Sequence, residues 1–310
     1  MDVLRLTLRQ LQIFVAVAQT GSTTSAGAEI ALSQSATSSA VNELERLLSL
    51  QLFDRAGKRL LLNDNGRALL PRALALLDGA AGIERMSHDG QAQAQSLRIG
   101  TSTTIGNYVL PKLLAGFIRN QGAGAADDWR SKVVIGNTAV VCDAVAAFEL
   151  DVGLVEGPCH LPTLDVTPWL QDEMVIVAAP EGVTSGAVAD SGRLSLRTLR
   201  EQVWLLRESG SGTRESTDQV LLPLLRSYRR SIELGSSEAI KHAVVEGLGI
   251  ACLSSWVVDD AITAGRLVRV TTTLPRILRQ CHLVVHREKQ PTPALSSFLA
   301  QALALHKAEG

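Results

Sequence analysis

The chain has 310 residues, which corresponds to about two domains at roughly 150 residues each. Its residues are 46% hydrophobic and 20% charged, so the composition allows sizeable cores and excludes a largely disordered chain. Thirty basic and 31 acidic side chains give a net charge of −1. That balance excludes a uniformly basic surface, but it allows a local basic patch that binds nucleic acid.

The chain shows no signal for a membrane or for export. No segment has about 18 consecutive apolar residues, and the opening residues lack the pattern of a secretory leader. The cysteines Cys142, Cys159, Cys252 and Cys281 are far apart and form no metal-type pair such as C-x-x-C. We therefore expect a cytoplasmic protein with unpaired thiols, no membrane segment, no metal and no cofactor.

The first 20 residues predict a helix. Leu8, Leu11, Val15 and Ala18 follow one another in steps of 3, 4 and 3, which places them on one helical face. The sequence 20–22 interrupts this pattern, and Ser22 or Thr23 is expected to cap the next helix.

The next two helices predict a helix-turn-helix. A short helix carries Ala26 and Gly27, and a longer helix reaches about Leu48 after the turn 31–33. We expect the apolar row of the longer helix to consist of Ala36, Ala40, Leu44 and Leu48. Its polar side carries Gln34, Ser38 and Asn42, flanked by Ser35 and Ser39. Small residues at the junction, among them Ala36, allow the two helices to approach closely.

The polar side of this helix has side chains that can read bases. Gln and Asn can form two hydrogen bonds with the major-groove edge of adenine, and Ser can pair with several bases. The runs 52–55 and 59–62 predict a β-hairpin. Arg55, Lys58 and Arg59 lie at its tip, where they would contact the phosphate backbone.

A long helix is expected after Asn63, over residues 64–93. Leu70, Leu74 and Leu77 form its apolar stripe. The stripe fits two arrangements equally well on pattern alone: it packs against a second copy of the chain, or against the chain's own domains.

From residue 97 the period changes to short β-type runs that alternate with helical patterns. The runs are Leu97–Gly100, Val133–Gly136, Val152–Val155, Met174–Ala178, Val203–Leu206, Ile232–Leu234, Ile250–Leu253 and Leu283–Val285. This alternation predicts an α/β fold with mostly parallel sheets and helices on both faces. The remaining length of about 215 residues is enough for two lobes, and 122–126 and 182–192 are expected to be loops.

Hydroxyl-rich segments follow several of these strands. At the carboxyl ends of parallel strands such segments gather around a ligand, and hydroxyl and N–H groups favour an anion or a carboxylate. We therefore expect a small-molecule cleft between the lobes. Its candidate residues are Thr101, Ser102, Thr103, Thr104, Asn137, Thr138, Ser209, Ser211, Thr213 and Ser237.

Enzyme motifs are incomplete. The segment Ser209–Arg214 is rich in glycine, but no Lys follows Gly212 as a phosphate-binding loop requires. The Ser nucleophile motif G-x-S-x-G is absent, and the histidines lack zinc spacing. We expect no catalytic residues and no enzymatic activity.

The N-terminal motifs resemble the winged helix-turn-helix of LysR-type transcriptional regulators. The resemblance is ordered over about 50 residues, from Gly21-Ser22 to Leu62-Asn63-Asp64-Asn65-Gly66, and includes Ser33-Gln34-Ser35-Ala36-Thr37-Ser38 and Leu52-Phe53-Asp54-Arg55. It implies a DNA-binding domain at 1–63, a linker helix at 64–93, and a two-lobed, periplasmic-binding-protein-like effector domain at 94–310. Lobe I would span about 94–168 and 275–310, and lobe II about 169–274.

The resemblance also implies roles for residues and partners. Gln34, Ser35, Ser38 and Ser39 would face bases, whereas Ser33, Arg55 and Arg59 would hold phosphates. The stripe of Leu70, Leu74 and Leu77 would form a dimer seam. The implied partners are double-stranded DNA, a small-molecule effector, RNA polymerase, and further copies of the chain in a homodimer or homotetramer.

The effector half is similar to the branch that includes regulators of sulfur assimilation. The segments 98–108, 151–157 and 211–215 carry this similarity. It implies effector contacts for Ser102, Thr104, Glu156 and Ser211. Glu156 stands where some relatives have a hydroxyl, so it would repel a dianion or accept a hydrogen bond from an amino group.

Four positions of the DNA-binding part depart from the family pattern: Thr23, Gly27, Ser39 and Asn63. Gly27 replaces an alanine and should cost about 1 kcal/mol of helix stability. Ser39 replaces a frequent Arg and removes an expected DNA contact.

Two alternative functions fit the same architecture. The chain could be a cytosolic small-molecule-binding protein or a thiol-redox sensor in which Cys142 and Cys159 approach each other. No cationic residue adjoins Cys142, but His160 follows Cys159, and activation of a thiol needs a cationic neighbour. The sequence favours the regulator over both.

Overall fold

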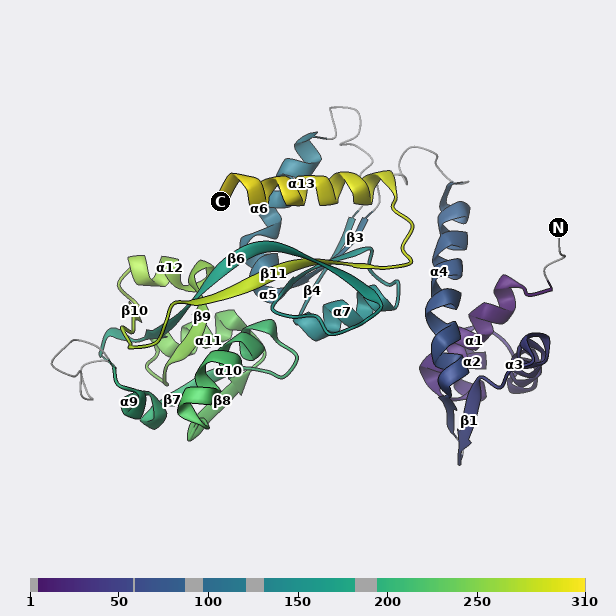
Figure 1. The fold of residues 1–310 in the computed structure, drawn as a ribbon, viewed down its shortest axis with the longest axis horizontal. Coiled ribbons are helices and arrows are strands. Elements are labelled where there is room, and N and C mark those ends of the chain that lie inside the picture. The colour runs from purple at the N-terminus through teal and green to yellow at the C-terminus, as the bar shows by residue number, and fades with distance from the viewer. Residues whose placement is uncertain (1–4, 58, 87–96, 121–130, 182–193, 310) are drawn as a thin grey trace. The chain divides into compact units, whose positions relative to one another are not determined.

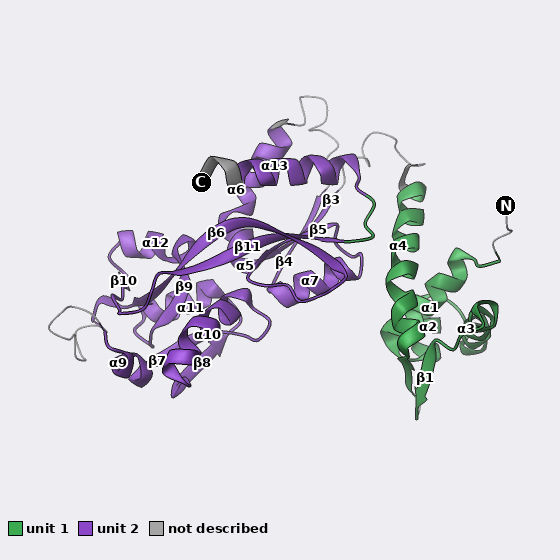
Figure 2. Cartoon of the chain, viewed as in Figure 1, with its two compact units in different colours: residues 1–94, 287–290 green, residues 95–286, 291–310 purple. Residues whose placement is uncertain are grey.

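The computed structural model describes residues 5–57, 59–86, 97–120, 131–181 and 194–309. It contains two compact units, residues 1–94 with 287–290 and residues 95–286 with 291–310 (Figure 2). We call them unit 1 and unit 2 and describe each separately. Lys58, the expected loops 122–126 and 182–192, and the end of the expected linker helix at 87–93 lie outside the described residues.

Unit 1 contains the predicted helices and hairpin (Figure 1). Its elements are α1 Leu8–Thr20, α2 Thr23–Glu29, α3 Gln34–Leu48, β1 Phe53–Ala56, β2 Arg59–Leu62 and α4 Asp64–Met86. Ser22 caps α2 by accepting a hydrogen bond from the backbone N–H of Ser25, and Ser33 caps α3 in the same way through Ala36. These caps satisfy backbone groups that the first turn of a helix leaves unpaired.

The buried face of α3 differs from the expected one at its N-terminal end. Thr37, Val41 and Leu44 are buried, whereas Ala36, the first residue of the predicted row, is exposed. Thr37 can be buried because its hydroxyl donates to the carbonyl of Ser33, at 3.0 Å. Thr37, not Ala36, packs against Gly27. The other residues of the predicted row, Ala40, Leu44 and Leu48, do contact the core of unit 1.

The close packing at Gly27 reverses the stability expected for an alanine there. A Cβ at this position would lie 2.7 Å from the carbonyl oxygen of Leu32 and 3.0 Å from the hydroxyl of Thr37. We predict that Gly27→Ala lowers the stability of unit 1 by ~1–3 kcal/mol, because overpacking outweighs helix propensity. Urea unfolding followed by far-UV circular dichroism would measure this change. Ala28→Gly, at an exposed site of the same helix, gives the propensity effect alone, and a stabilised Gly27→Ala variant would contradict the packing argument.

Unit 2 has a first set of elements around β3. They are β3 Leu97–Ser102, α5 Thr103–Tyr108, α6 Leu110–Asn120, β4 Ser131–Gly136, α7 Thr138–Ala146, β5 Val152–Glu156 and β6 Leu164–Ala178. The second set is α9 Leu196–Glu201, β7 Val203–Arg207, α10 Gly212–Leu225, β8 Arg230–Leu234, α11 Ser237–Val245, β9 Ala251–Ser254, α12 Ser255–Thr263 and β10 Val268–Arg269. The chain then returns through β11 Ile277–His286 and ends with α13 Pro293–Glu309.

The sheets confirm the α/β class, but they are less parallel than expected. One sheet has the order β10-β6-β11-β5-β3-β4, with β9 also paired to β6, and β7 and β8 form a second sheet. The pairs β3–β4, β3–β5 and β7–β8 are parallel. The long strands β6 and β11 are antiparallel to each other and run the length of unit 2 (Figure 1). The expected runs identified only short parts of these two strands, so their antiparallel pairing was not predicted.

Two main hydrophobic cores define two lobes in unit 2. Trp169, Phe117 and Phe298 lie in the first core, and Trp204 and Leu221 lie in the second. Both tryptophans are fully buried, and each indole N–H donates to a backbone carbonyl. Strands of these cores end at the polar segments, so the cores fix the positions of those segments. In the described part of the chain, no helix is long and apolar enough to cross a membrane.

Candidate functional sites

In unit 1, α3 and the β1–β2 hairpin border an open groove of about 660 Å³. The predicted DNA-contacting residues that line it are Gln34, Ser38, Asn42, Arg55 and Arg59. The groove therefore brings together the polar side of α3 and the basic hairpin. A DNA-binding domain in which a helix reads bases and an adjacent wing holds phosphates needs this arrangement.

The predicted DNA-contacting side chains differ in solvent exposure and in the hydrogen bonds that they already form. Gln34, Ser35, Ser39 and Asn42 are exposed, and Ser38 is half-buried. Arg55 and Arg59 are exposed on the hairpin. Ser33 is exposed too, but its hydroxyl already accepts the capping hydrogen bond from Ala36, at 3.2 Å.

Thr23 belongs to the same groove and was not predicted as a site residue. Its hydroxyl accepts a hydrogen bond from the side-chain amide of Gln34, at 3.2 Å. Both residues of this hydrogen bond line the groove. Thr23 was identified in the sequence only as a possible cap and as a departure from the family pattern, and neither observation indicated contact with Gln34.

The predicted dimer stripe packs within unit 1. Leu70, Leu74 and Leu77 are half-buried against its hydrophobic core, which is the second arrangement that the sequence left open. Other apolar side chains are exposed in this unit: Leu8 by 48%, Leu76 by 55% and Ile83 by 70%. These three and α4 residues such as Ala80 line one continuous surface hollow.

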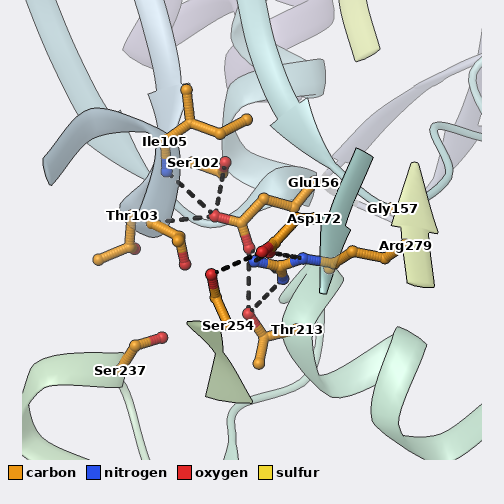
Figure 3. Close-up of polar contacts among 12 residues, drawn as sticks. Ser102, Thr103, Ile105, Glu156, Gly157, Asp172, Thr213, Ser237, Ser254 and Arg279 are labelled. Atoms are coloured by element: carbon orange, nitrogen blue, oxygen red, sulfur yellow. Dashed lines mark hydrogen bonds and ion pairs between the residues drawn. The ribbon is translucent and has the colours of Figure 1, made fainter. Parts of the chain in front are cut away.

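In unit 2, the polar strand ends converge on the carboxylate of Glu156, at the end of β5 (Figure 3). The side chain is 2% exposed. One oxygen, Oε1, accepts hydrogen bonds from Ser102 Oγ at 2.9 Å and from the backbone N–H groups of Thr104 and Ile105 at 2.9 and 3.3 Å. The other oxygen, Oε2, accepts from Thr213 Oγ1 at 3.0 Å.

Arg279 of β11 completes this arrangement. Its Nη1 lies 2.6 Å from Glu156 Oε2, and its Nη2 lies 2.6 Å from Asp172 Oδ2 in β6. Asp172 also accepts a hydrogen bond from Ser254 Oγ, at 2.8 Å. We call Glu156, Arg279 and Asp172 the buried triad, because all three side chains are at most 2% exposed.

The triad has two carboxylates for one guanidinium, and their pKa values move in opposite directions. Burial would raise the pKa of Glu156, but the charge of Arg279 and the donors Thr104, Ser102 and Thr213 outweigh it and hold the pKa below its usual value. Burial raises the pKa of Asp172 above its usual value despite Arg279. Asp172 is therefore the carboxylate that receives less compensation.

This geometry changes the role expected for Glu156. The family resemblance implied a carboxylate that contacts the effector and either repels a dianion or accepts a hydrogen bond from an amino group. Instead, both oxygens are bonded within the protein, and Arg279 compensates the charge. The hydrogen-bond donors of Ser102 and of the first turn of α5 are therefore already paired with Glu156.

A second polar group adjoins the triad. Arg207 of β7 is 3% exposed; it donates to Ser237 Oγ at 3.0 Å, and its Nη2 lies 3.5 Å from Thr103 Oγ1. The carboxylate of Glu208 pairs with the same guanidinium at 2.8 Å. The hydroxyl of Thr104 is buried and has no hydrogen-bond partner among the described residues.

Further predicted residues join the two lobes. Thr138 Oγ1 donates to the carbonyl of Glu156 at 2.9 Å and accepts from the N–H of Gly212 at 3.2 Å. Asn137 caps α7 and donates to Glu208 at 3.2 Å. The remaining positions are the buried Thr101 and Ser211, and Ser209, which is exposed and outside this network.

Three residues of the site were not predicted from the sequence: Arg207, Arg279 and Asp172. A signal existed for Arg279: it lies between Ile277 and Cys281 in a strand with alternate residues buried, so a charged residue occupies a position that the period of two assigns to the core. Asp172 stands in the same way between buried Leu170 and Met174. Charges at such positions need internal partners, which the sequence alone could not identify.

Comparisons with known proteins agree with both halves of the chain. The family described as "Bacterial regulatory helix-turn-helix protein, lysR family" matches residues 8–67, and "LysR substrate binding domain" matches residues 90–306. The chain is 44% identical to the "Uncharacterized HTH-type transcriptional regulator YeiE" of Escherichia coli K12 over 296 residues, 96% of this chain and 97% of that one.

Solved structures have the same fold. A full-length OxyR variant from Pseudomonas aeruginosa is similar with a TM-score of 0.66 and 22% identity, covering 98% of this chain and 96% of that chain. The regulatory domain of CcmR from Synechocystis PCC6803, in complex with 2-PG, is similar with a TM-score of 0.59 and 26% identity. That match covers 68% of this chain and 97% of that one.

Proposed function

We propose, since the chain belongs to the LysR family of transcriptional regulators, that an anionic small molecule bound in unit 2 controls its binding to DNA. Residues 1–63 would form the DNA-binding domain, 64–93 the linker, and 94–310 the effector domain. The protein would act in the cytoplasm, on double-stranded DNA and through contact with RNA polymerase, and without catalysis.

The groove of unit 1 supports the assignment of DNA contacts. We propose that Gln34, Ser38 and Asn42 read bases and that Arg55 and Arg59 hold phosphates. Ser35 and Ser39 extend the base-reading surface, whereas Ser33 contributes its helix cap. Contacts to bases give sequence preference, while contacts to phosphates give affinity that falls with salt.

A dimer is proposed to form through the exposed face of α4. Leu8, Leu76 and Ile83 expose large apolar surfaces on this unit, and burial of such a surface favours association. We therefore propose these residues as the seam, in place of the half-buried Leu70, Leu74 and Leu77. Two copies would place two reading helices on half-sites about one helical turn apart, or a multiple of it.

The single observation that carries the effector site is the buried, unpartnered hydroxyl of Thr104. Thr104 directly follows Thr103, whose hydroxyl lies 3.5 Å from Arg207 Nη2. An unsatisfied buried hydroxyl costs free energy unless a ligand or water pairs with it. The anionic group of an effector would replace Glu208 on the Arg207 guanidinium and accept hydrogen bonds from Thr103 and Thr104. The similar regulatory domain of CcmR binds 2-PG, which fits this expectation.

Thr104→Val tests the site, because valine keeps the shape of the side chain and removes only the hydroxyl. We predict unchanged or slightly higher stability, by up to ~1 kcal/mol, because no hydrogen bond is lost. The anion concentration that gives half of the maximal increase in melting temperature should rise about tenfold. The measurement is thermal unfolding of the full chain against a panel of anions that begins with inorganic sulfate and phosphate.

Two further variants make this test specific. Thr217→Val removes a buried hydroxyl that donates to the carbonyl of Thr213, so it should lose stability and keep the ligand response. Glu208→Gln weakens the internal partner of Arg207, so it should lower the concentration of anion required. An unchanged ligand response in Thr104→Val would rule out the proposed contact.

A further inference from the structure

The first residues of α2 and α3 meet at the groove of unit 1. Thr23 begins α2 and Gln34 begins α3, and both line the groove together with Ser38 and Asn42. The side-chain amide of Gln34 donates a hydrogen bond from Nε2 to the hydroxyl of Thr23, at 3.2 Å. The contact therefore joins the first helix of the helix-turn-helix to the residue that we propose as a base reader.

The packing of the two helices supports this contact. Thr23 and Gly27 are four residues apart on α2, so they share one helical face. Gln34 and Thr37 are three residues apart on α3 and share a face in the same way. Gly27 is buried, and a Cβ on it would lie 3.0 Å from the hydroxyl of Thr37. The close approach of the two helices thus lies about one turn from the hydrogen bond on each helix.

The hydrogen bond uses one part of the bonding capacity of the amide. A glutamine amide has two N–H donors on Nε2 and one carbonyl acceptor, Oε1. Thr23 takes one donor. Among the described residues, neither the second donor nor Oε1 of Gln34 has a further hydrogen-bond partner, and the side chain is exposed. One donor and one acceptor therefore remain for a base.

We propose that Thr23 orients the amide of Gln34 so that it pairs with adenine in preference to guanine. The inference rests on the proposed reading of bases by Gln34. In the major groove adenine presents an N7 acceptor beside an N6 amino donor, whereas guanine presents two acceptors, N7 and O6. The remaining N–H of Gln34 would donate to N7 of adenine, while Oε1 accepts from the amino group. With guanine, Oε1 would face O6, and neither oxygen could donate.

The hydroxyl of Thr23 should matter most when DNA fills the groove. A bound duplex excludes water, and a polar group left unpaired there costs free energy. In the complex with adenine all three groups of the amide are paired, because Thr23 takes the N–H that the base does not use. Without this hydroxyl, both N–H groups of Nε2 are free to turn toward N7 and O6 of guanine. Loss of the hydroxyl should therefore relax the discrimination between the two purines.

The ratio of affinities for the two purines at one base pair tests the inference. The full-length wild-type protein selects duplexes from a random pool, and Gln34→Ala identifies the base pair whose preference depends on Gln34. Fluorescence anisotropy then compares adenine with guanine at this pair in otherwise identical duplexes. Wild type should prefer adenine by about tenfold or more, and Thr23→Val should reduce the ratio to within about threefold.

Two further variants separate this role from a general effect on folding. Thr23→Ser keeps the hydroxyl and should retain the wild-type ratio. Thr24→Val makes the same change as Thr23→Val at an exposed residue of the same helix, and it should retain the ratio too. Binding to a scrambled duplex depends on phosphate contacts, so it should stay within about twofold of wild type in all three variants.

The possible outcomes distinguish this inference from the proposed function. An unchanged ratio in Thr23→Val would overturn the inference and leave base reading by Gln34 intact. A wild-type preference for guanine at this pair would also overturn it, because the amide would then bind in the reverse orientation. If Gln34→Ala alters the preference at no base pair, the proposed base reading fails together with the inference.

Discussion

An Arg279→Met variant is expected to lose ~3–5 kcal/mol of the stability of unit 2, because it leaves two buried carboxylates without their cation. Arg279 forms ion pairs with Glu156 and Asp172, with N–O distances of 2.6 Å in each. All three side chains are at most 2% exposed. The loss should lower the melting temperature by roughly 10 °C. Tryptophan fluorescence reports on this unit, since all four tryptophans belong to it.

Arg276→Met is the matched control. Arg276 lies just before the same strand and pairs with Glu173, the neighbour of Asp172, but its side chain is 68% exposed. An exposed ion pair contributes less than ~1 kcal/mol. Equal small losses in both variants would contradict the role of the buried triad. Partial recovery is expected when Glu156→Gln and Asp172→Asn are added to Arg279→Met, because no buried charge then remains.

The pH dependence should differ between wild type and Arg279→Met. Burial alone would raise the pKa of Glu156, but Arg279 and the hydrogen-bond donors hold it below its usual value in the folded protein. The stabilising contribution of Glu156 is therefore present above the usual pKa of a carboxyl group and is lost as the pH falls through the folded value. Without Arg279, burial should raise the pKa of Glu156. In wild type the raised pKa of Asp172 favours the folded state on mild acidification and the lowered pKa of Glu156 opposes it. In the variant both groups should favour it, so the gain in stability on mild acidification should be larger than in wild type.

Gly212→Ala is expected to have a comparably large effect. A Cβ on Gly212 would lie 1.8 Å from the carbonyl oxygen of Glu156 and 2.8 Å from Thr138 Oγ1. The first turn of α10 must therefore move away from β5, which breaks the hydrogen bond from Gly212 to Thr138 and displaces Thr213 from Glu156. We expect a loss of ~3 kcal/mol or more together with loss of the effector response.

Thermal unfolding with and without the anion panel measures both effects. Gly235→Ala is the control, since a Cβ there would meet nothing within 4 Å, and it should change stability by less than ~1 kcal/mol. A Gly212→Ala protein as stable and responsive as this control would contradict the close approach of α10 to β5.

The elements of unit 1 could be predicted because their signals are local. Helical spacing, the caps Ser22 and Ser33, and the hairpin are all properties of short segments. The burial of Thr37 in place of Ala36 could not be predicted in the same way. This polar residue can be buried because its hydroxyl donates to the carbonyl of Ser33 and its side chain packs against Gly27.

In unit 2, the site residues near the ends of strands could be predicted from the sequence. Ser102 and Thr213 follow or adjoin buried strands, and the structure places both on Glu156. Arg279 comes from a strand more than 100 residues away from Glu156 along the chain. Its pairing depends on the long antiparallel strands β6 and β11, which the period of short runs did not reveal.

We propose that this regulator recognises DNA sequence through Gln34. The direct test is fluorescence anisotropy on two duplexes, one selected by the wild-type protein from a random pool and one with the same bases scrambled. Gln34→Ala should lower the preference for the selected duplex by about tenfold or more, and binding to the scrambled duplex, which depends on phosphate contacts, should stay within about twofold at the same salt concentration. An unchanged preference, or an equal loss on both duplexes, would contradict base reading by Gln34.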